Sequence, residues 1–328
     1  MEEVARRAGV SRALVSIVFR ELPGASAETR DRVRAAAAEI GYRPDHRARL
    51  LSRRETRLLG TVFHIGDEFQ SDLLVELYAA AAAEGYELVL SGVTARRTEA
   101  DAVHELQSLR CDALILLGPT MRASDLRTIG RLTPTVAVAR AVAADVDVVR
   151  TDDVTGARIA TKHLLDLGHS RIVHVDGGRS PGAAERRRGY QHAMRAAGLA
   201  GLISLQTGGL TEADGRAAAL RLLAVGAPLP TAAFVFNDQS ALGHVDAFRR
   251  AGVDVPADHS VIGFDNSRIA RSVWTQLSTV GQDAPSLGRS AVDRAVGRLR
   301  QQSTPRRTTL VPPELVVRQS TRPLPDNR

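Results

Sequence analysis

Polar side chains follow several apolar runs in the later two-thirds of the sequence. Arg140 comes directly after the run TVAVA, Asn237 follows TAAFVF, and Asp265 ends SVIGFD. Gln282 lies in TVGQD, and Arg186 lies in the basic stretch ERRRG. These residue types offer directed hydrogen-bond donors and acceptors, so together they suit a ligand that carries several hydroxyl groups.

The same residues have a simpler alternative role as loop residues or helix caps. Asp238, for example, begins the segment DQSALG and either caps a helix or touches the ligand. Catalysis is not favoured, because the sequence has no GxGxxG after a strand, no GxxxxGK(S/T), no GxSxG and no His/Asp/Glu grouping at metal-ligand spacing. The single cysteine, Cys111, excludes an intrachain disulfide and a multi-cysteine zinc site. We therefore expect neither an enzyme nor a cofactor or metal site.

The hydropathy pattern predicts a scaffold that brings these residues together. From Leu58 onward, apolar runs alternate with helical stretches in two series: LLGTVFHI, YELVLSGV, DALILLG and TVAVA, then RIVHVDG, TAAFVFN and SVIGFD. Alternation of strand and helix predicts parallel sheets. Two series that divide near residues 150–155 predict two doubly wound α/β lobes. A ligand would bind in the cleft between them, at the carboxyl ends of the strands.

The first sixth of the sequence is basic. The 328-residue chain has a net charge of +7, and residues 1–57 contain 13 arginines and 8 acidic residues, a net of +5. With 44% apolar and 25% charged residues, the composition is typical of a soluble globular protein. No run approaches the ~18 apolar residues of a membrane span, and the charged first residues are not a secretory signal, so we expect a cytoplasmic protein. The basic segment favours a polyanionic partner.

This basic segment has the pattern of a helix-turn-helix. Residues 2–8 predict a short helix, Gly9 predicts a turn, and Ser11 predicts the N-cap of a second helix. Ser26 predicts the N-cap of a third helix. A generic three-helix bundle is the alternative, but the spacing of small residues, glycine, valine and serine, together with the basic excess, favours DNA binding.

Four short segments match, in the same order, the lactose/galactose repressor family of bacterial transcription factors. They are residues 3–11 (EVARRAGVS), 15–16 (VS), 26–30 (SAETR) and 41–44 (GYRP). The similarity continues through the whole chain, so the sequence resembles a member of this family. The resemblance implies an all-α helix-turn-helix headpiece at 1–44, a hinge at 45–56, and at 57–328 a two-lobed α/β core like that of periplasmic binding proteins. It also implies lobe one at about 57–151 and 284–309, lobe two at about 152–281 and 313–322, and crossings between them near 150–155, 282–284 and 309–313.

By their place in the family's motif, Arg12, Ala13 and Ile17 are the side chains that the second helix presents to base edges in the major groove. Arginine can donate two hydrogen bonds to guanine, whereas alanine and isoleucine offer only apolar contact, for example to a thymine methyl. The alternative for Arg12 is a solvated residue at the helix start. The resemblance assigns three residues to phosphate contacts, which fix register without reading sequence: Ser11, Ser16 and Arg20.

Residues 44–53 (PDHRARLLSR) match the family's hinge, which becomes helical when two copies meet over DNA. A short cationic helix is unstable alone in water, yet it can fold when a minor groove and a partner copy supply contacts. The resemblance places Ala48 and Leu51 in the minor groove, where Leu51 acts as the apolar wedge that kinks the duplex. The alternative is that Leu50 and Leu51 are linker residues that pack on the core.

The resemblance also assigns a sugar-binding role to the polar residues of the core. It adds a second wall after the first strand, in which Phe69 can stack on an apolar ligand face. The complete expected set is His64, Asp67, Phe69, Arg140, Arg186, Asn237, Asp265 and Gln282. Many sugar-responsive relatives have an aromatic residue after Gly208-Gly209, where this chain has Leu210. The class of sugar therefore stays open. His169, in LGHSR, matches a structural turn residue.

The implied function is a ligand-responsive, DNA-binding transcriptional regulator, a repressor of sugar-uptake or catabolic genes that acts at the nucleoid. A dimer would bind a palindromic operator, and a sugar-like effector that closes the cleft would change DNA affinity, either as inducer or as corepressor. Residues 321–328 contain two prolines and no leucine heptad, which favours a dimer over a tetramer. The family usually has several residues before Met1, so the true start stays open. The alternatives are a sugar-binding transport receptor, which needs a signal peptide and no headpiece, and a sugar-processing enzyme.

Overall fold

The structure is a computed structural model that describes residues 1–19, 21–42, 55–226, 228–300 and 308–324. It contains two compact units, Met1–Thr56 and Arg57–Arg328. Three residues with expected DNA contacts lie outside the described residues: Arg20, Ala48 and Leu51.

The first unit is a small bundle of three helices, α1 (Glu2–Ala8), α2 (Arg12–Phe19) and α3 (Ala27–Glu39). Gly9 ends α1 at φ 63°, a left-handed conformation that favours glycine. The Ser11 hydroxyl accepts a hydrogen bond from the Leu14 amide at 3.2 Å, and Ser26 accepts one from Thr29, so both predicted caps are confirmed. Val15 and Val18 of α2 are buried against the other two helices.

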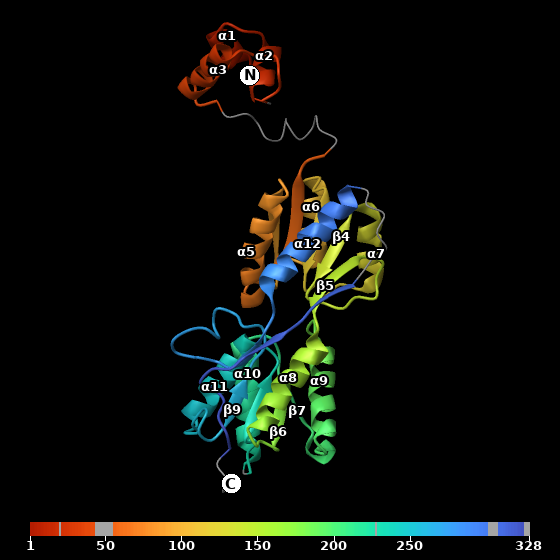
Figure 1. The fold of residues 1–328 in the computed structure, drawn as a ribbon, viewed down its shortest axis with the longest axis vertical. Helices are drawn as coiled ribbons and strands as arrows, with labels where there is room; N and C mark the ends of the chain where they lie inside the picture. Colours follow the sequence, from red (N-terminus) through yellow and green to blue (C-terminus); the bar gives the residue numbers. More distant parts are fainter. Residues whose placement is uncertain (20, 43–54, 227, 301–307, 325–328) are drawn as a thin grey trace. The chain divides into compact units, whose positions relative to one another are not determined.

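Lobe one of the second unit is a six-stranded parallel sheet in the order β11-β5-β4-β3-β1-β2. Its strands are β1 (Leu58–His64), β2 (Glu87–Val93), β3 (Ala113–Leu117), β4 (Thr135–Val138), β5 (Asp147–Thr151) and β11 (Thr308–Val311). Four helices flank it: α5 (Glu68–Ala83), α6 (Glu99–Ser108), α7 (Ala123–Leu132) and α12 (Ala284–Leu299). Helices α5 and α12 cover one face, and α6 and α7 cover the other (Figure 1).

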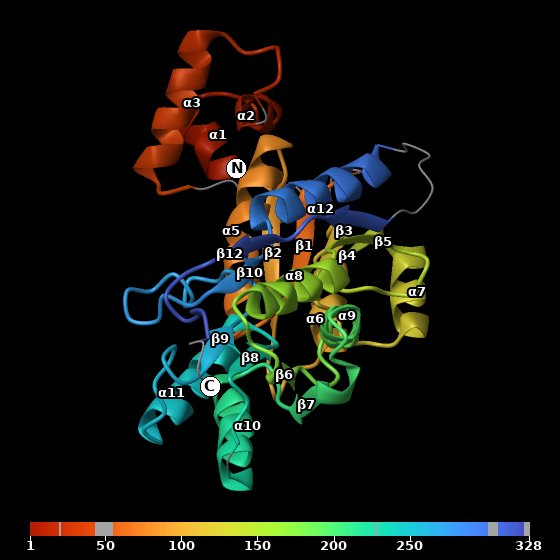
Figure 2. The same cartoon turned by 60° about the horizontal axis from the view of Figure 1, so that its bottom comes forward.

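Lobe two is a four-stranded parallel sheet in the order β7-β6-β8-β9. Its strands are β6 (Ile172–Asp176), β7 (Ser204–Thr207), β8 (Ala232–Val235) and β9 (Ser260–Ile262), and a short 3-10 helix spans Ala200–Leu202. Its helices are α8 (Asp153–Asp166), α9 (Ala183–Ala196), α10 (Glu212–Val225) and α11 (Asp238–Arg250). Helices α8 and α9 pack on one face, and α10 and α11 pack on the other (Figure 2).

The chain passes between the lobes at three places. These follow β5, follow β10 (Thr279–Gly281), and lie between β11 and β12 (Glu314–Val316). Strands β10 and β12 pair antiparallel beside lobe two. The predicted architecture of doubly wound lobes is thus confirmed, and residues at the carboxyl ends of strands from both sheets line the same cleft.

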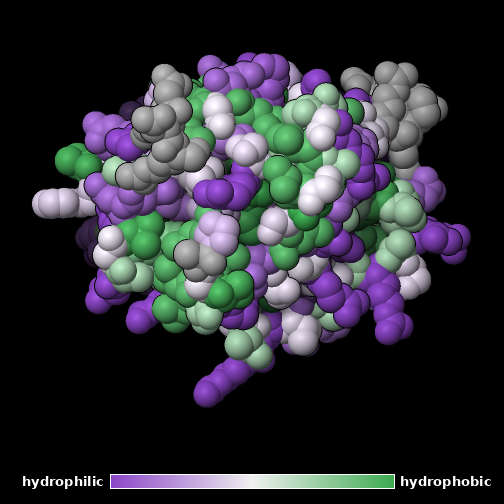
Figure 3. Space-filling model, turned by 90° about the horizontal axis from the view of Figure 1, so that it is seen from below, coloured by the Kyte–Doolittle hydropathy of each residue, from purple (hydrophilic) through white to green (hydrophobic). Residues whose placement is uncertain are grey.

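The surface at the lobe-two end shows apolar patches that are separated by hydrophilic side chains (Figure 3). In the part of the chain that the structure describes, every helix is too short or too polar to cross a bilayer.

Candidate ligand cavity and DNA-reading helix

A cavity of about 320 Å³ lies between the two lobes, where the strands of both sheets end. We call it the cleft cavity. Seven of the eight residues predicted to contact a ligand line it: His64, Asp67, Phe69, Arg186, Asn237, Asp265 and Gln282. The sequence therefore located the cavity through residues that are up to 218 positions apart.

Arg186 is the best-fixed side chain of the cavity. It lies on α9 and is buried, and its Nε donates to the Asp153 carboxylate at 3.0 Å while Nη1 donates to the Phe236 carbonyl at 2.7 Å. Its Nη2 lies 3.6 Å from the Asp265 carboxylate. The guanidinium carbon is 3.7 Å from the centre of the Phe264 ring, a cation-π contact. These contacts orient the guanidinium and neutralise its charge.

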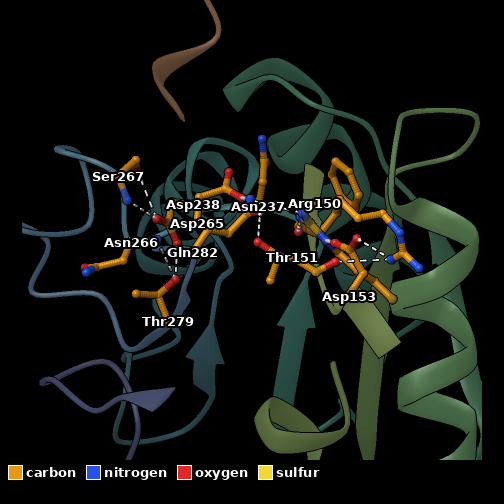
Figure 4. Close-up of polar contacts among 12 residues, drawn as sticks. Arg150, Thr151, Asp153, Asn237, Asp238, Asp265, Asn266, Ser267, Thr279 and Gln282 are labelled. Carbon is orange, nitrogen blue, oxygen red and sulfur yellow. Dashed lines mark hydrogen bonds and ion pairs between the residues drawn. The ribbon is translucent and has the colours of Figure 1, made fainter. Parts of the chain in front are cut away.

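Asp265 and Gln282 connect the ligand wall to the passages between the lobes (Figure 4). The Gln282 amide donates to Asp265 Oδ1 at 2.7 Å, and its carbonyl accepts from the Thr151 hydroxyl at 2.7 Å. Asp265 adopts φ 114°, in the region that favours glycine, so its backbone is strained at this point. Burial raises the pKa of the Asp265 carboxyl well above its usual 3.8, although Arg186 opposes the rise. A ligand in the cleft cavity would contact residues that also join the two lobes.

Asn237 and Asp238 have different roles, which the sequence left open. Asn237 caps α11 by accepting from the Ser240 amide at 2.9 Å, and its amide nitrogen donates to no group in the described part of the chain. Asp238 is buried and does not line the cavity. Its carboxylate accepts from the Ser267 amide at 2.8 Å and from the Thr279 hydroxyl at 2.6 Å, and burial raises its pKa to about 6. Asp238 thus holds the loop that presents Asp265 (Figure 4).

The lobe-one wall contains His64 at the end of β1. Its Nε2 lies 3.2 Å from the Glu99 carboxylate, which raises the pKa of His64. Glu99 is itself fixed, since it accepts from the amides of Thr120 at 2.6 Å and of Met121 at 2.9 Å. The imidazole is therefore held in place by a charged hydrogen bond.

Asp67 and Phe69 complete the lobe-one wall at the start of α5. Asp67 caps this helix by accepting from the Gln70 amide at 3.1 Å, and burial raises the pKa of its carboxyl. Phe69 is largely buried in the aliphatic core of lobe one, so only part of its ring contributes to the cavity.

Arg140 is the predicted contact that does not line the cavity. Its Nη1 donates to the carbonyls of Pro119 and Met121, the latter at 3.2 Å. A long side chain at a strand end can point in several directions, and here backbone carbonyls attract it away from the cleft. Arg140 supports the loop that in turn holds Glu99.

The sequence missed other lining residues: Gln70, Thr94, Thr120, Pro181, Thr211, Phe236 and Gln239. Phe236 could have been found, because it ends the apolar run directly before Asn237. Leu210, recognised as the position where relatives have an aromatic residue, does line the cavity.

The exposed face of α2 carries the residues expected to read DNA. Arg12 and Ala13 are exposed and Ile17 is half-buried, on the side away from the buried valines of this helix. Arg12 lies 3.5 Å from the Glu2 carboxylate, and both side chains are at least 70% exposed. Such an exposed pair is weak, so Arg12 is available to another partner. Ser11 is exposed while capping α2, and Ser16 is half-buried.

Comparison with known proteins matches two family models to the chain. The model of bacterial regulatory proteins, lacI family, matches residues 1–45, and that of the periplasmic binding protein-like domain matches residues 161–321. The HTH-type transcriptional repressor CytR of Escherichia coli K12 is 32% identical, over 99% of this chain and 97% of its own length. The transcriptional regulator GalR of the same strain is 31% identical, over 98% of this chain and 95% of its own length.

Two solved structures are also similar. A LacI transcriptional regulator from a Rhodococcus species has a TM-score of 0.78 and 41% identity, covering 81% of this chain and 98% of that one. The lac repressor dimer bound to operator and the anti-inducer ONPF has a TM-score of 0.86 and 28% identity, covering 97% of this chain and 98% of that one.

Proposed function

Since the chain belongs to the LacI family of bacterial regulatory proteins, we propose that it represses sugar-uptake or catabolic genes under the control of a small sugar-like effector. As a family member it is a DNA-binding regulator of transcription and not an enzyme. A dimer binds a palindromic operator in the cytoplasm, at the nucleoid. The observation that carries the proposal is the cleft cavity, which gathers hydrogen-bonding side chains from both lobes.

The charges around the cavity favour an uncharged effector. Among the described lining residues, Arg186 is already paired with Asp153 and Asp265, and His64 is paired with Glu99. An anionic ligand would therefore meet no unpaired cation there. A neutral, hydroxyl-bearing ligand needs no counter-charge and still satisfies the polar groups.

This preference is tested by matched pairs of a sugar and its phosphate ester. We expect one sugar of a panel to raise the midpoint of thermal unfolding, and its phosphate ester to bind about tenfold more weakly or worse. Isothermal calorimetry on the full chain measures both dissociation constants. Tighter binding of the phosphate ester would contradict the neutral-effector proposal.

DNA reading is assigned to α2, because Arg12 and Ala13 are exposed and Ile17 is accessible on one side of it. Arg12→Ala should cost roughly 1–3 kcal/mol of binding to the operator and scarcely change binding to random DNA. Fluorescence anisotropy with both DNAs measures this difference. Equal losses on the two DNAs would mean that Arg12 contacts phosphate or nothing.

An exposed apolar surface supports the dimer. Trp274, the single tryptophan, is 86% exposed beside exposed Val273, and Val75 and Tyr78 are exposed on α5. An ion pair between Arg271 and Asp72 ties the loop that bears Trp274 to α5. Exposed apolar side chains can mark contact surfaces. We expect Trp274→Ser to shift the sedimentation profile from dimer to monomer, and an unchanged dimer would contradict this assignment.

The effector would control DNA binding because it contacts residues at the places where the chain passes between the lobes. Gln282 joins Asp265 in the ligand wall to Thr151 at another passage between the lobes. An effector that binds these groups differently in two lobe arrangements shifts their populations. Such coupling is typically ~1–3 kcal/mol, and its sign decides between inducer and corepressor.

A further inference from the structure

A second hollow adjoins the cleft cavity on the lobe-one side. It has a volume of about 550 Å³ and lies between α6 and the loop that precedes α7. We call it the α6 groove. Four residues line both hollows: His64, Val93, Thr94 and Thr120. The cavity and the groove are therefore neighbours that share one dividing wall.

The dividing wall is anchored. The His64 ring is about 30% exposed, and Glu99 holds it while accepting from Thr120 and Met121 on its other side. Thr120 also donates from its hydroxyl to Glu99 at 2.8 Å. A ligand that extended from the cavity into the groove would thus pass a fixed, polar side chain.

The α6 groove has an apolar floor and a mostly uncharged polar rim. Val93, Val103 and Met121 form part of the floor, and the rim includes His104 and Gln107 on α6. In the described part of the chain, neither of these two rim side chains makes a hydrogen bond. They are free to bind a ligand.

The charged groups of the groove leave no cation for an anionic substituent. Arg97 donates to the Glu105 carboxylate at 2.6 Å and to the Gly92 carbonyl at 2.6 Å, so its charge is already paired with a carboxylate. Asp125 adds a carboxylate to the same lining. A ring with apolar faces and hydroxylated edges matches this surface, as it does the cleft cavity.

We propose that the effector is an uncharged glycoside of two rings. The first ring occupies the cleft cavity against Arg186, Asn237 and Asp265, and the second lies in the α6 groove beyond His64. The proposal rests on the proposed function, since it requires a sugar-like effector between the lobes. Together the two hollows lie within the range of about 300–1,000 Å³ that is typical of small-molecule sites.

The test compares monosaccharides with the disaccharides that contain them. Glucose is compared with cellobiose and maltose, and galactose with lactose and melibiose, by calorimetry and thermal unfolding of the full-length chain. One disaccharide should bind at least about tenfold more tightly than its component sugar, because only it fills the groove.

Two variants test whether the higher affinity for the disaccharide comes from contacts in the α6 groove. Ala100 is exposed on α6 and lines the groove but not the cavity, so Ala100→Trp should remove the disaccharide's gain and leave the monosaccharide's affinity unchanged. Ala224→Trp, at an exposed position of α10 outside both hollows, is the matched control. Gln107→Ala removes a rim side chain without adding bulk and should weaken the disaccharide alone, by about three- to tenfold.

The outcomes separate the two levels of the proposal. If monosaccharide and disaccharide bind equally, or if the variants weaken both alike, the two-ring effector is wrong and the single-ring effector remains. If none of these sugars binds the wild-type chain, both proposals are contradicted.

Discussion

The two lobes share a plan of parallel strands flanked by helices, but they bury different groups. The core of lobe one is mainly aliphatic, built around residues such as Leu59, Leu73 and Ile115, and its buried rings are Phe69 and Tyr86. Lobe two buries stacked rings: His174 stacks on Tyr190 and Phe234, with centroids 5.4 and 4.6 Å apart. His244, His259 and Phe248 form a second buried stack.

The difference extends to how each lobe supports its wall of the cavity. In lobe two, buried ion pairs and the Asp238 network fix Arg186 and Asp265 before any ligand arrives. In lobe one, the corresponding support is a single pair, His64, which is about 30% exposed, with the buried Glu99. Side chains locked by their surroundings give the more specific contacts. We infer that lobe two presents the more rigid wall of the cavity.

The largest effect should come from removing the buried cation of lobe two. Arg186→Ala leaves the buried Asp265 carboxyl without its neighbouring cation, and leaves the buried Asp153 carboxylate with Arg150 alone, at 3.8 Å. Removing one partner of a buried ion pair typically costs about 3–5 kcal/mol of unfolding free energy. Ligand binding should be lost as well. Chemical denaturation measures the first effect, and calorimetry measures the second.

The matched control is Arg188→Ala on the same helix. Arg188 pairs with Glu185 at the surface, and such pairs contribute about 0–1 kcal/mol. If both variants had the same small effect, the buried ion pairs would not organise the site.

The second-largest effect is a loss of folding stability at acid pH, and it comes from buried histidines of lobe two. Burial lowers the pKa of His174 and of His259 to about 4, against an ordinary value of 6.5 in the unfolded chain. The unfolded chain therefore binds more protons below 6.5, and stability that is present above 6.5 is lost as the pH falls toward 4.

His174→Phe should reduce that loss. A phenyl ring can keep the place of the imidazole in its stack, because Nε2 of His174 has no hydrogen-bond partner in the described part of the chain. It loses only the hydrogen bond between Nδ1 and the Phe234 carbonyl, at 3.0 Å. Between pH 7.5 and 5, we expect the variant to lose roughly 1–2 kcal/mol less stability than the wild type. His192→Phe, at an exposed position of α9, controls for the substitution. Identical pH profiles for wild type and His174→Phe would refute a buried neutral imidazole.

Lobe one should respond to pH in the opposite direction. Glu99 raises the pKa of His64, so this pair contributes stability that is complete below 6.5 and is lost as the pH rises through the folded-state pKa of His64. His64→Gln should flatten the alkaline side of the thermal-stability profile, while the loss between pH 6.5 and 4 that comes from His174 and His259 remains. A flattened acid side instead would mean that the assignment of the two responses to the two lobes is wrong.

The smallest effect should come from the ion pairs that bridge the lobes at one rim. Arg271 contacts Asp72 at 2.9 Å and Arg268 contacts Glu68 at 3.6 Å, and all four side chains are partly exposed. Arg271→Gln should weaken effector binding by roughly 0.2–1 kcal/mol at low salt, an effect that vanishes at high salt.

Its control is Arg250→Gln, because Arg250 pairs with Asp246 within one helix of lobe two. That change should leave effector binding unaffected at any salt concentration. A salt-independent loss in Arg271→Gln would point to packing rather than charge.

Local signals predicted the parts of the molecule that depend on neighbouring residues. Gly9 and Ser26 marked helix boundaries correctly, because a left-handed turn and an N-cap are set by one or two residues. The order of apolar runs likewise predicted two sheets whose strand ends meet. The lining of the cleft by Asn237 and Asp265 followed from that topology.

Side-chain direction and long-range pairing could not be predicted in this way. Arg140 follows a strand as Asn237 does, yet its flexible chain turns toward the carbonyls of Pro119 and Met121. The pairing of His64 with Glu99 joins residues 35 positions apart. The role of Asp238 depends on a loop that returns to it from residue 267. Such contacts arise from tertiary packing and leave no local pattern.

The central claim is that an uncharged effector in the cleft controls sequence-specific DNA binding. Its most direct test is to select fragments of a genomic library with the full-length protein at fixed salt, with and without a panel of sugars, since salt alone changes DNA affinity steeply. We predict that one palindrome is enriched and that one sugar changes its affinity by about 5–150-fold. Salt-sensitive binding without sequence preference, unchanged by every sugar, would contradict the account.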